Sequence, residues 1–311
     1  MPRRKSSKRA APRGIEQLPS GPVVNPLSPI SILSEDDVAS LHTASLEVLR
    51  KHGMRFSLPK ARNILKEAGA DVSESDAMVR FDPDLVMEYV AKAPASFTLH
   101  ARNPVHDLHL DNRHINFSCV SSAPHTTDTL NGRRGGNRQD FENFLKLTQM
   151  VNVAHGTAGY PVEPIDIDVP VRHLHATRAT VTLTDKTFRL YNHNRQRTLD
   201  VLEMARIVHG LSAEAFQETP CVFASINPNS PREYDESMLW GMIECALAGQ
   251  VLMISPFILA GAMAPSSLAG ALTQQNAEAL AGIAFCQMVR AGTPVAYGGF
   301  VSNADMDAEK A

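Results

Sequence analysis

Hydrophobic residues recur at helical spacing in three segments near the start of the chain. The first segment follows Ser34, which can cap a helix together with Asp37, and it ends at Gly53. The second begins at Pro59 and ends at Gly69, and the third begins after the cap Asp82. The apolar faces of these helices consist of Val38, Leu41, Val48, Leu49, Ile64, Leu65, Ala68, Leu85, Val86, Tyr89 and Val90.

The period then changes to the alternation typical of β-strands. Residues 97–99, 108–110 and 115–117 alternate apolar and polar side chains, and Asn131-Gly132 is a strong hairpin-turn signal. Residues 34–135 are therefore predicted to form a small N-terminal subdomain of helices and strands.

From Asn137 onward, short apolar segments alternate with helical patterns. The predicted strands are 151–159, 187–192, 221–226, 250–254 and 294–297, and each of them leads towards a helix or a loop that could begin one. This rhythm favours a parallel α/β architecture of about five β/α units in residues 136–311. A doubly wound sheet can end after five strands, whereas a (β/α)₈ barrel needs three more.

Charge is distributed unevenly along the 311 residues, whose overall net charge is −3. The first 30 residues carry a net charge of +5 and the remainder −8. Residues 1–33 are thus expected to be a basic, disordered arm and a proline-containing linker, with docking of nucleic acid or a partner as the alternative for the arm. Because no run of 18 apolar residues occurs, no membrane segment is expected.

Common chemical motifs are absent from the sequence. The four cysteines, Cys119, Cys221, Cys245 and Cys286, form no CxxC pair, which favours a reduced, cytoplasmic chain. No GxGxxG, HExxH or GxSxG pattern occurs. Because His106 and His109 lie on a predicted β-ribbon, where positions three apart face opposite sides, we expect no metal site there.

Polar and aromatic residues follow the predicted strands. Since the carboxyl ends of parallel strands share one edge, such residues are expected to line one substrate pocket. The candidate substrate-binding residues are Tyr160, Glu163, His193, Asn227, Phe257 and Tyr297. For each residue alone, ordinary loop composition is the favoured explanation, whereas the whole collection favours a binding pocket.

Several motifs together resemble the trimethylamine methyltransferase family, which comprises corrinoid-dependent methylamine and quaternary-amine demethylases. The most specific stretch is 261–278, GAMAPSSLAGALTQQNAE, and the similarity extends roughly over residues 33–306. Supporting motifs are GMRF (53–56), AGAD (68–71), APASFTLH (93–100), INPNSP (226–231) and YGGFVSN (297–303).

The resemblance implies a partial (β/α)₈ TIM barrel and methyl transfer from trimethylamine or a betaine-like quaternary amine to cobalt. No cofactor would bind the chain directly, since a partner corrinoid protein would carry the methylcobamide. Aromatic faces, including Tyr191, would hold the ammonium group, Glu163 would supply a counter-charge, and Asn227 or Asn229 would hold a betaine carboxylate. A homo-oligomer is expected when the protein is full length, without nucleic-acid or membrane partners.

The family continues beyond this sequence, so we expect a C-terminally truncated chain whose catalytic residues are unknown. One alternative is a truncated and catalytically inactive fragment. Another is an unrelated β/α-barrel lyase, which would need a lysine or a metal cluster at the strand ends.

Overall fold

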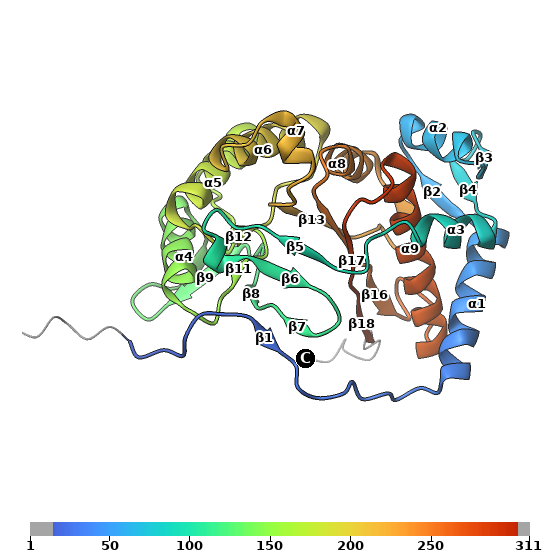
Figure 1. The fold of residues 1–311 in the computed structure, drawn as a ribbon, viewed down its shortest axis with the longest axis horizontal. Coiled ribbons are helices and arrows are strands. Elements are labelled where there is room, and N and C mark those ends of the chain that lie inside the picture. Colours follow the sequence, from blue (N-terminus) through green and yellow to red (C-terminus); the bar gives the residue numbers. More distant parts are fainter. Residues whose placement is uncertain (1–14, 304–311) are drawn as a thin grey trace, which may run out of the picture.

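The central feature of the fold is a curved series of parallel strands with helices along its outer side (Figure 1). A computed structural model describes residues 15–303, so most of the predicted basic arm lies outside the described residues. Two three-stranded parallel sheets, ordered β8-β11-β12 and β13-β15-β17, are joined by a parallel bridge between Arg189 and Phe223. The strands are β8 (Ser118–Cys119), β11 (Gly156–Thr157), β12 (Thr187–Phe188), β13 (Phe223–Ile226), β15 (Val251–Ile254) and β17 (Val295–Tyr297).

Most of the helices that connect these strands begin at polar caps that the sequence supplies. The side chains of Asn137, Asp235 and Ser267 each accept a hydrogen bond from a backbone N–H in the first turn of α4, α8 and α9. The outer helices are α4 (Arg138–Met150), α5 (Val169–Leu183), α6 (Arg195–Val208), α7 (Ala213–Gln217), α8 (Glu236–Leu247) and α9 (Leu268–Val289).

A second layer, formed by the N-terminal helices, packs against α9 (Figure 1). Ser34 and Asp37 form the predicted capping box at the start of α1. This layer also holds a four-stranded sheet ordered β14-β2-β4-β3. Its elements are α1 (Glu35–Lys51), β2 (Met54–Phe56), α2 (Pro59–Glu67), β3 (Asp71–Ser73), β4 (Met78–Arg80), α3 (Pro83–Val90) and, from a later part of the chain, β14 (Glu233–Tyr234).

One hydrophobic core extends through both layers. The ring of Phe56 on β2 lies 6.0 Å from that of Phe81, and 5.5 Å from those of Tyr234 and Phe285, which belong to β14 and α9. The N-terminal elements therefore stabilise the outer wall of the parallel strands.

The single tryptophan, Trp240, lies where the N-terminal layer meets the outer helices. The ring of Trp240 on α8 has the Lys60 ammonium of α2 5.1 Å from its centroid and the Arg195 guanidinium of α6 4.9 Å from it. Such cation–π contacts link α2 to the outer helices.

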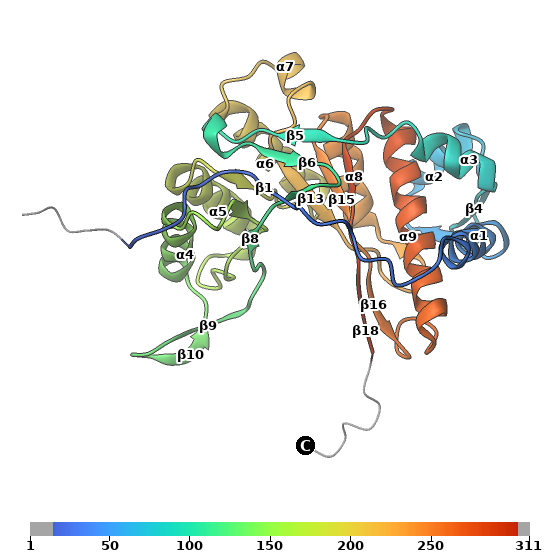
Figure 2. The ribbon, with the colours of Figure 1, turned by 60° about the horizontal axis from the view of Figure 1, so that its bottom comes forward.

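Shorter β-elements lie around the parallel strands. The N-terminal segment that contains β1 crosses in front of the parallel strands on its way to α1 (Figure 2). Its residues Val23 and Val24 pair with β7. The remaining elements form two-stranded pairs: β1 (Val23–Val24) with β7 (His114–Ile115), β5 (Phe97–Leu99) with β6 (Leu108–Leu110), β9 (His125–Asp128) with β10 (Gly132–Gly135), and β16 (Phe257–Ala260) with β18 (Phe300–Asn303). A short 3₁₀ turn covers Pro104–His106.

The parallel series differs from the sequence prediction in its first strands. Of the predicted strand 115–117 only Ile115 lies in a strand, β7, whereas β8 begins at Ser118 and pairs with β11, so the series begins before residue 136. In the predicted strand 151–159 only Gly156–Thr157 pairs, since the preceding residues form a loop bound to Lys186. Among residues 15–303, no helix combines the length and apolarity needed to span a bilayer.

Candidate functional site

The loops that follow β8, β11 and β12 enclose a cavity of about 270 Å³. Because these strands are parallel neighbours, their carboxyl ends lie at one edge of the sheet, where α/β folds bind ligands. The cavity is lined by Ser122, Gly159, Tyr160, Glu163, Arg189, Leu190, Tyr191 and His193.

Aromatic rings form one part of the cavity. Tyr160 and Tyr191 stack with their centroids 5.7 Å apart, and His193 meets Tyr191 edge-on at 5.2 Å. Phe141 on α4 supports Tyr160 from behind in an edge-on contact at 5.5 Å. Burial raises the pKa of the Tyr160 phenol, so this hydroxyl stays protonated at neutral pH.

Charged side chains form the other part. Burial raises the pKa of Glu163, while Arg172, whose Nη1 lies 3.7 Å from the Glu163 carboxylate, opposes that rise. Burial lowers the pKa of Arg189. Burial, with the charge of Arg189 as the next cause, lowers the pKa of His193, which favours a neutral imidazole.

Close backbone packing fixes the loops that carry these groups. Gly159 has φ of +142°, and a Cβ there would lie 3.0 Å from Ser121 Cβ and 3.2 Å from Arg189 Nη1. Gly241 on α8 packs on the loop after β12, because a Cβ at this position would lie 2.3 Å from the carbonyl oxygen of Asn192. Glycine is needed at both places, so the cavity wall depends on them.

The cavity gathers three of the six residues selected from the sequence, namely Tyr160, Glu163 and His193. The other three do not line it and lie further along the series: Asn227 follows β13, Phe257 begins β16 shortly after β15, and Tyr297 is the last residue of β17. Asn227 is exposed, Phe257 stacks on Phe300 with centroids 4.9 Å apart, and the Tyr297 hydroxyl donates to Asn276 Oδ1 at 3.2 Å. Asn229, the other residue considered for a carboxylate, donates its amide to Asp235.

Two cavity residues with polar side chains, Arg189 and Ser122, were not predicted from the sequence. Arg189 falls inside the predicted strand 187–192, so nothing marked it as a loop residue. Ser122 follows β8, a strand whose two residues are too few to show an alternating pattern.

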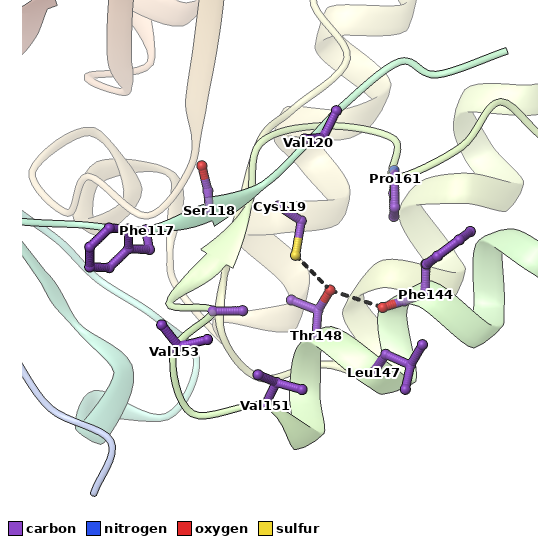
Figure 3. Close-up of a pocket in the computed structure, with 11 residues that line it drawn as sticks. Phe117, Ser118, Cys119, Val120, Phe144, Leu147, Thr148, Val151, Val153 and Pro161 are labelled. Atoms are coloured by element: carbon purple, nitrogen blue, oxygen red, sulfur yellow. Dashed lines mark hydrogen bonds between the residues drawn. The ribbon is translucent and has the colours of Figure 1, made fainter. Parts of the chain in front are cut away.

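A larger groove of about 530 Å³ lies between β8 and α4 (Figure 3). Its lining is mostly apolar, and its one polar chain runs from Cys119 Sγ to the Thr148 hydroxyl, which donates to the Phe144 carbonyl. Leu147 and Val153 are 53% and 62% exposed there. The groove therefore offers a packing surface with little polar chemistry.

Among residues 15–303, neither a metal-binding cluster nor a lysine, one of which the lyase alternative would need, lies at this edge. In the described part of the chain, no three His, Cys, Asp or Glu side chains converge on a point. Lys186 is buried at the start of β12, the opposite end from the cavity, and donates to the carbonyls of Thr148, Val151 and Ala154.

The sequence of the chain matches a known protein family and several known proteins. A family model described as trimethylamine methyltransferase (MTTB) matches residues 2–309. Glycine betaine methyltransferase of Desulfitobacterium hafniense strain Y51 is 35% identical over 276 residues, which are 89% of this chain and 57% of that protein. Trimethylamine methyltransferase MttB of D. hafniense strain DSM 10664 / DCB-2 is 27% identical, over 88% of this chain and 55% of that protein.

Trimethylamine methyltransferase MttB1 of Methanosarcina mazei is 25% identical, over 89% of this chain and 57% of its own length. The chain thus spans somewhat more than half the length of these curated relatives. Among solved structures, the hydroxylamine MtmB complex gives a TM-score of 0.45 at 10% identity, covering 86% of this chain and 60% of that one.

Proposed function

Because the chain belongs to the trimethylamine methyltransferase family, we propose that it acts in methyl transfer from a methylated amine to the cobalt of a corrinoid protein. The relatives' names support an amine of the trimethylamine or glycine betaine type. A cavity of about 270 Å³ suits a small amine rather than a corrin macrocycle, which agrees with a corrinoid carried by a partner.

The observation that carries the proposal is the stack of Tyr160 and Tyr191 beside Glu163. A quaternary ammonium group has no N–H to donate, so aromatic faces and a nearby carboxylate are the groups that recognise it. His193 adds a further ring that is neutral at physiological pH and therefore does not repel the cation.

The residues of the cavity fit a reaction that needs no proton. With a quaternary donor, the corrinoid would supply the electron pair of the new carbon–cobalt bond, and the pair of the broken carbon–nitrogen bond would stay on nitrogen as the leaving tertiary amine. This step requires no proton transfer from the protonated phenol of Tyr160 or to the neutral His193. The cavity would act by orienting the methyl group and excluding water.

The test is methyl transfer to a corrinoid protein reduced to the cob(I)alamin state, followed by its absorbance spectrum. Trimethylamine, glycine betaine, carnitine and proline betaine are the candidate donors, and the D. hafniense glycine betaine methyltransferase is the positive control for the acceptor. Methylation with at least one donor is expected. No transfer from any donor, with an active control, would refute the proposed function.

The fold we propose is part of a (β/α)₈ barrel. Six parallel strands of residues 15–303 follow one another in chain order, with helices outside and with free edges at β8 and β17. Because such barrels close with eight strands, two more β/α units would complete the series, rather than the three expected from the sequence. The apolar groove beside β8 is where such a unit would pack.

A further inference from the structure

Arg189 carries a positive charge that no carboxylate of residues 15–303 balances through a salt bridge. Its side chain lines the cavity, and within residues 15–303 its guanidinium donates one hydrogen bond, from Nη1 to the Ala158 carbonyl at 3.2 Å. A desolvated guanidinium without a charged partner is costly, so such a group is typical of a binding site for an anion.

Within residues 15–303, the other charged side chains near the cavity already have partners. Glu163, the cavity's one carboxylate, faces Arg172 at 3.7 Å. Arg197 lies on the Tyr191 ring, with its guanidinium carbon 5.8 Å from the centroid, and donates to the Tyr191 hydroxyl at 3.3 Å. The local excess of positive charge therefore disfavours a ligand that carries only a cation.

Arg189 also lies on the same side of the chain as the aromatic groups. Arg189, Tyr191 and His193 are spaced two residues apart after β12, and all three line the cavity. One short segment thus presents a guanidinium and two aromatic rings to a single ligand.

We propose that Arg189 binds a carboxylate of the substrate, so that the chain selects a quaternary ammonium zwitterion over trimethylamine. The inference rests on the proposed function, because it assigns the second half of the same substrate. The trimethylammonium group lies against Tyr160 and Tyr191, and the carboxylate accepts the free N–H groups of Arg189, whose planar fork matches a carboxylate. Asn227 and Asn229, the carboxylate ligands expected from the sequence, have no part in this arrangement.

The experiment measures equilibrium binding by calorimetry and needs no corrinoid. Glycine betaine, its methyl ester and choline share the trimethylammonium group, and only glycine betaine carries a carboxylate. A charge-assisted hydrogen bond contributes enough for a difference of about tenfold to a hundredfold in Kd. The full chain is expected to bind glycine betaine more tightly than the ester and choline by that factor.

Two substitutions then locate the effect. Arg189→Gln should weaken glycine betaine binding by the same factor and leave choline binding unchanged or improved, while Arg189→Lys should restore part of the loss. Arg178→Gln, at an exposed position on α5, removes the same charge away from the cavity and is the matched control. Circular dichroism checks that each variant is folded.

The outcomes distinguish failure of the role of Arg189 from failure of the proposed function. Equal affinity of the full chain for glycine betaine and its ester would overturn the role of Arg189, and so would an Arg189→Gln variant that keeps the preference. If Arg189→Gln does not fold, the comparison of the two ligands in the unmodified chain decides. If none of the three ligands binds, the amine site itself is refuted, and the proposed function with it.

Discussion

The rings of Tyr160 and Tyr191 stack at a centroid distance of 5.7 Å and an interplanar angle of 22°, although they come from loops after different strands, β11 and β12. Because β11 and β12 are parallel neighbours, two residues 31 positions apart meet at one edge. The faces of these rings are the central element of the candidate amine site.

Replacing Tyr191 with leucine is expected to weaken binding of choline by roughly tenfold, since a desolvated cation–π contact contributes about 1–2 kcal/mol. Leucine keeps an apolar side chain but removes the aromatic face. Tyr89→Leu is the control, because Tyr89 contacts Lys92 on the N-terminal layer. Calorimetric titration measures both variants, and an unchanged Kd for Tyr191→Leu would contradict the aromatic site.

Binding of a quaternary cation should weaken on acidification. The pKa of Glu163 is raised above 4.5 by burial, so its negative charge is lost as pH falls through that raised value. His193, whose pKa lies below 6.5, adds a positive charge over an overlapping range. Choline titrations across this range should show the decline.

Glu163→Gln is expected to bind choline more weakly near neutral pH and to lack the Glu163 component of this decline. Protonation of Glu163 has the opposite effect on the stability of the fold. A carboxyl with a raised folded pKa favours the folded state below its unfolded pKa, and this contribution is lost as pH rises through the folded value. An identical pH profile in the variant and the unmodified chain would exclude Glu163 as the counter-charge.

Lys186→Met should lower the free energy of unfolding by about 2–5 kcal/mol. The Lys186 ammonium satisfies three carbonyls at the end of α4 and in the loop after it, and each buried carbonyl left without a donor costs about 1–3 kcal/mol. Lys146→Met, an exposed change on α4, should lie within about 0.5 kcal/mol of the unmodified chain. Urea unfolding measures both, and equal effects would show that the three contacts add nothing.

The groove between β8 and α4 should promote self-association of the isolated chain, because its apolar side chains border a strand edge that is unpaired among residues 15–303. The double variant Leu147→Lys, Val153→Lys should shift the chain towards monomer in size-exclusion chromatography with light scattering. Ile207→Lys, at a 61% exposed site on α6, is the control and should have little effect. A monodisperse monomer before any substitution would contradict the prediction.

The helices could be predicted from the sequence because their signals are local. Ser34 with Asp37, and Asp82 before Pro83, mark helix starts within one turn, and the structure places α1 and α3 there. The strand β8 could not be predicted in this way. Its two residues pair with β11 more than 30 positions later, and so short a segment shows no periodicity.

The candidate site was predictable only in part, for a related reason. Sequence position shows that Tyr160 and Asn227 each follow a strand, but not how far apart the order and curvature of the sheet place those strands. Arg189 was hidden within an apolar run, since a strand end cannot be located to one residue from the pattern alone. Its role depends on burial, which only the folded arrangement provides.

The position of Trp240 between Lys60 and Arg195 gives the molecule a built-in optical probe. As the single tryptophan, Trp240 supplies fluorescence that reports on the junction of α2, α6 and α8 without any label. Circular dichroism follows all helices at once. Coincident denaturation curves from the two signals would mean that the N-terminal layer and the parallel strands unfold as one cooperative unit, as their shared core requires.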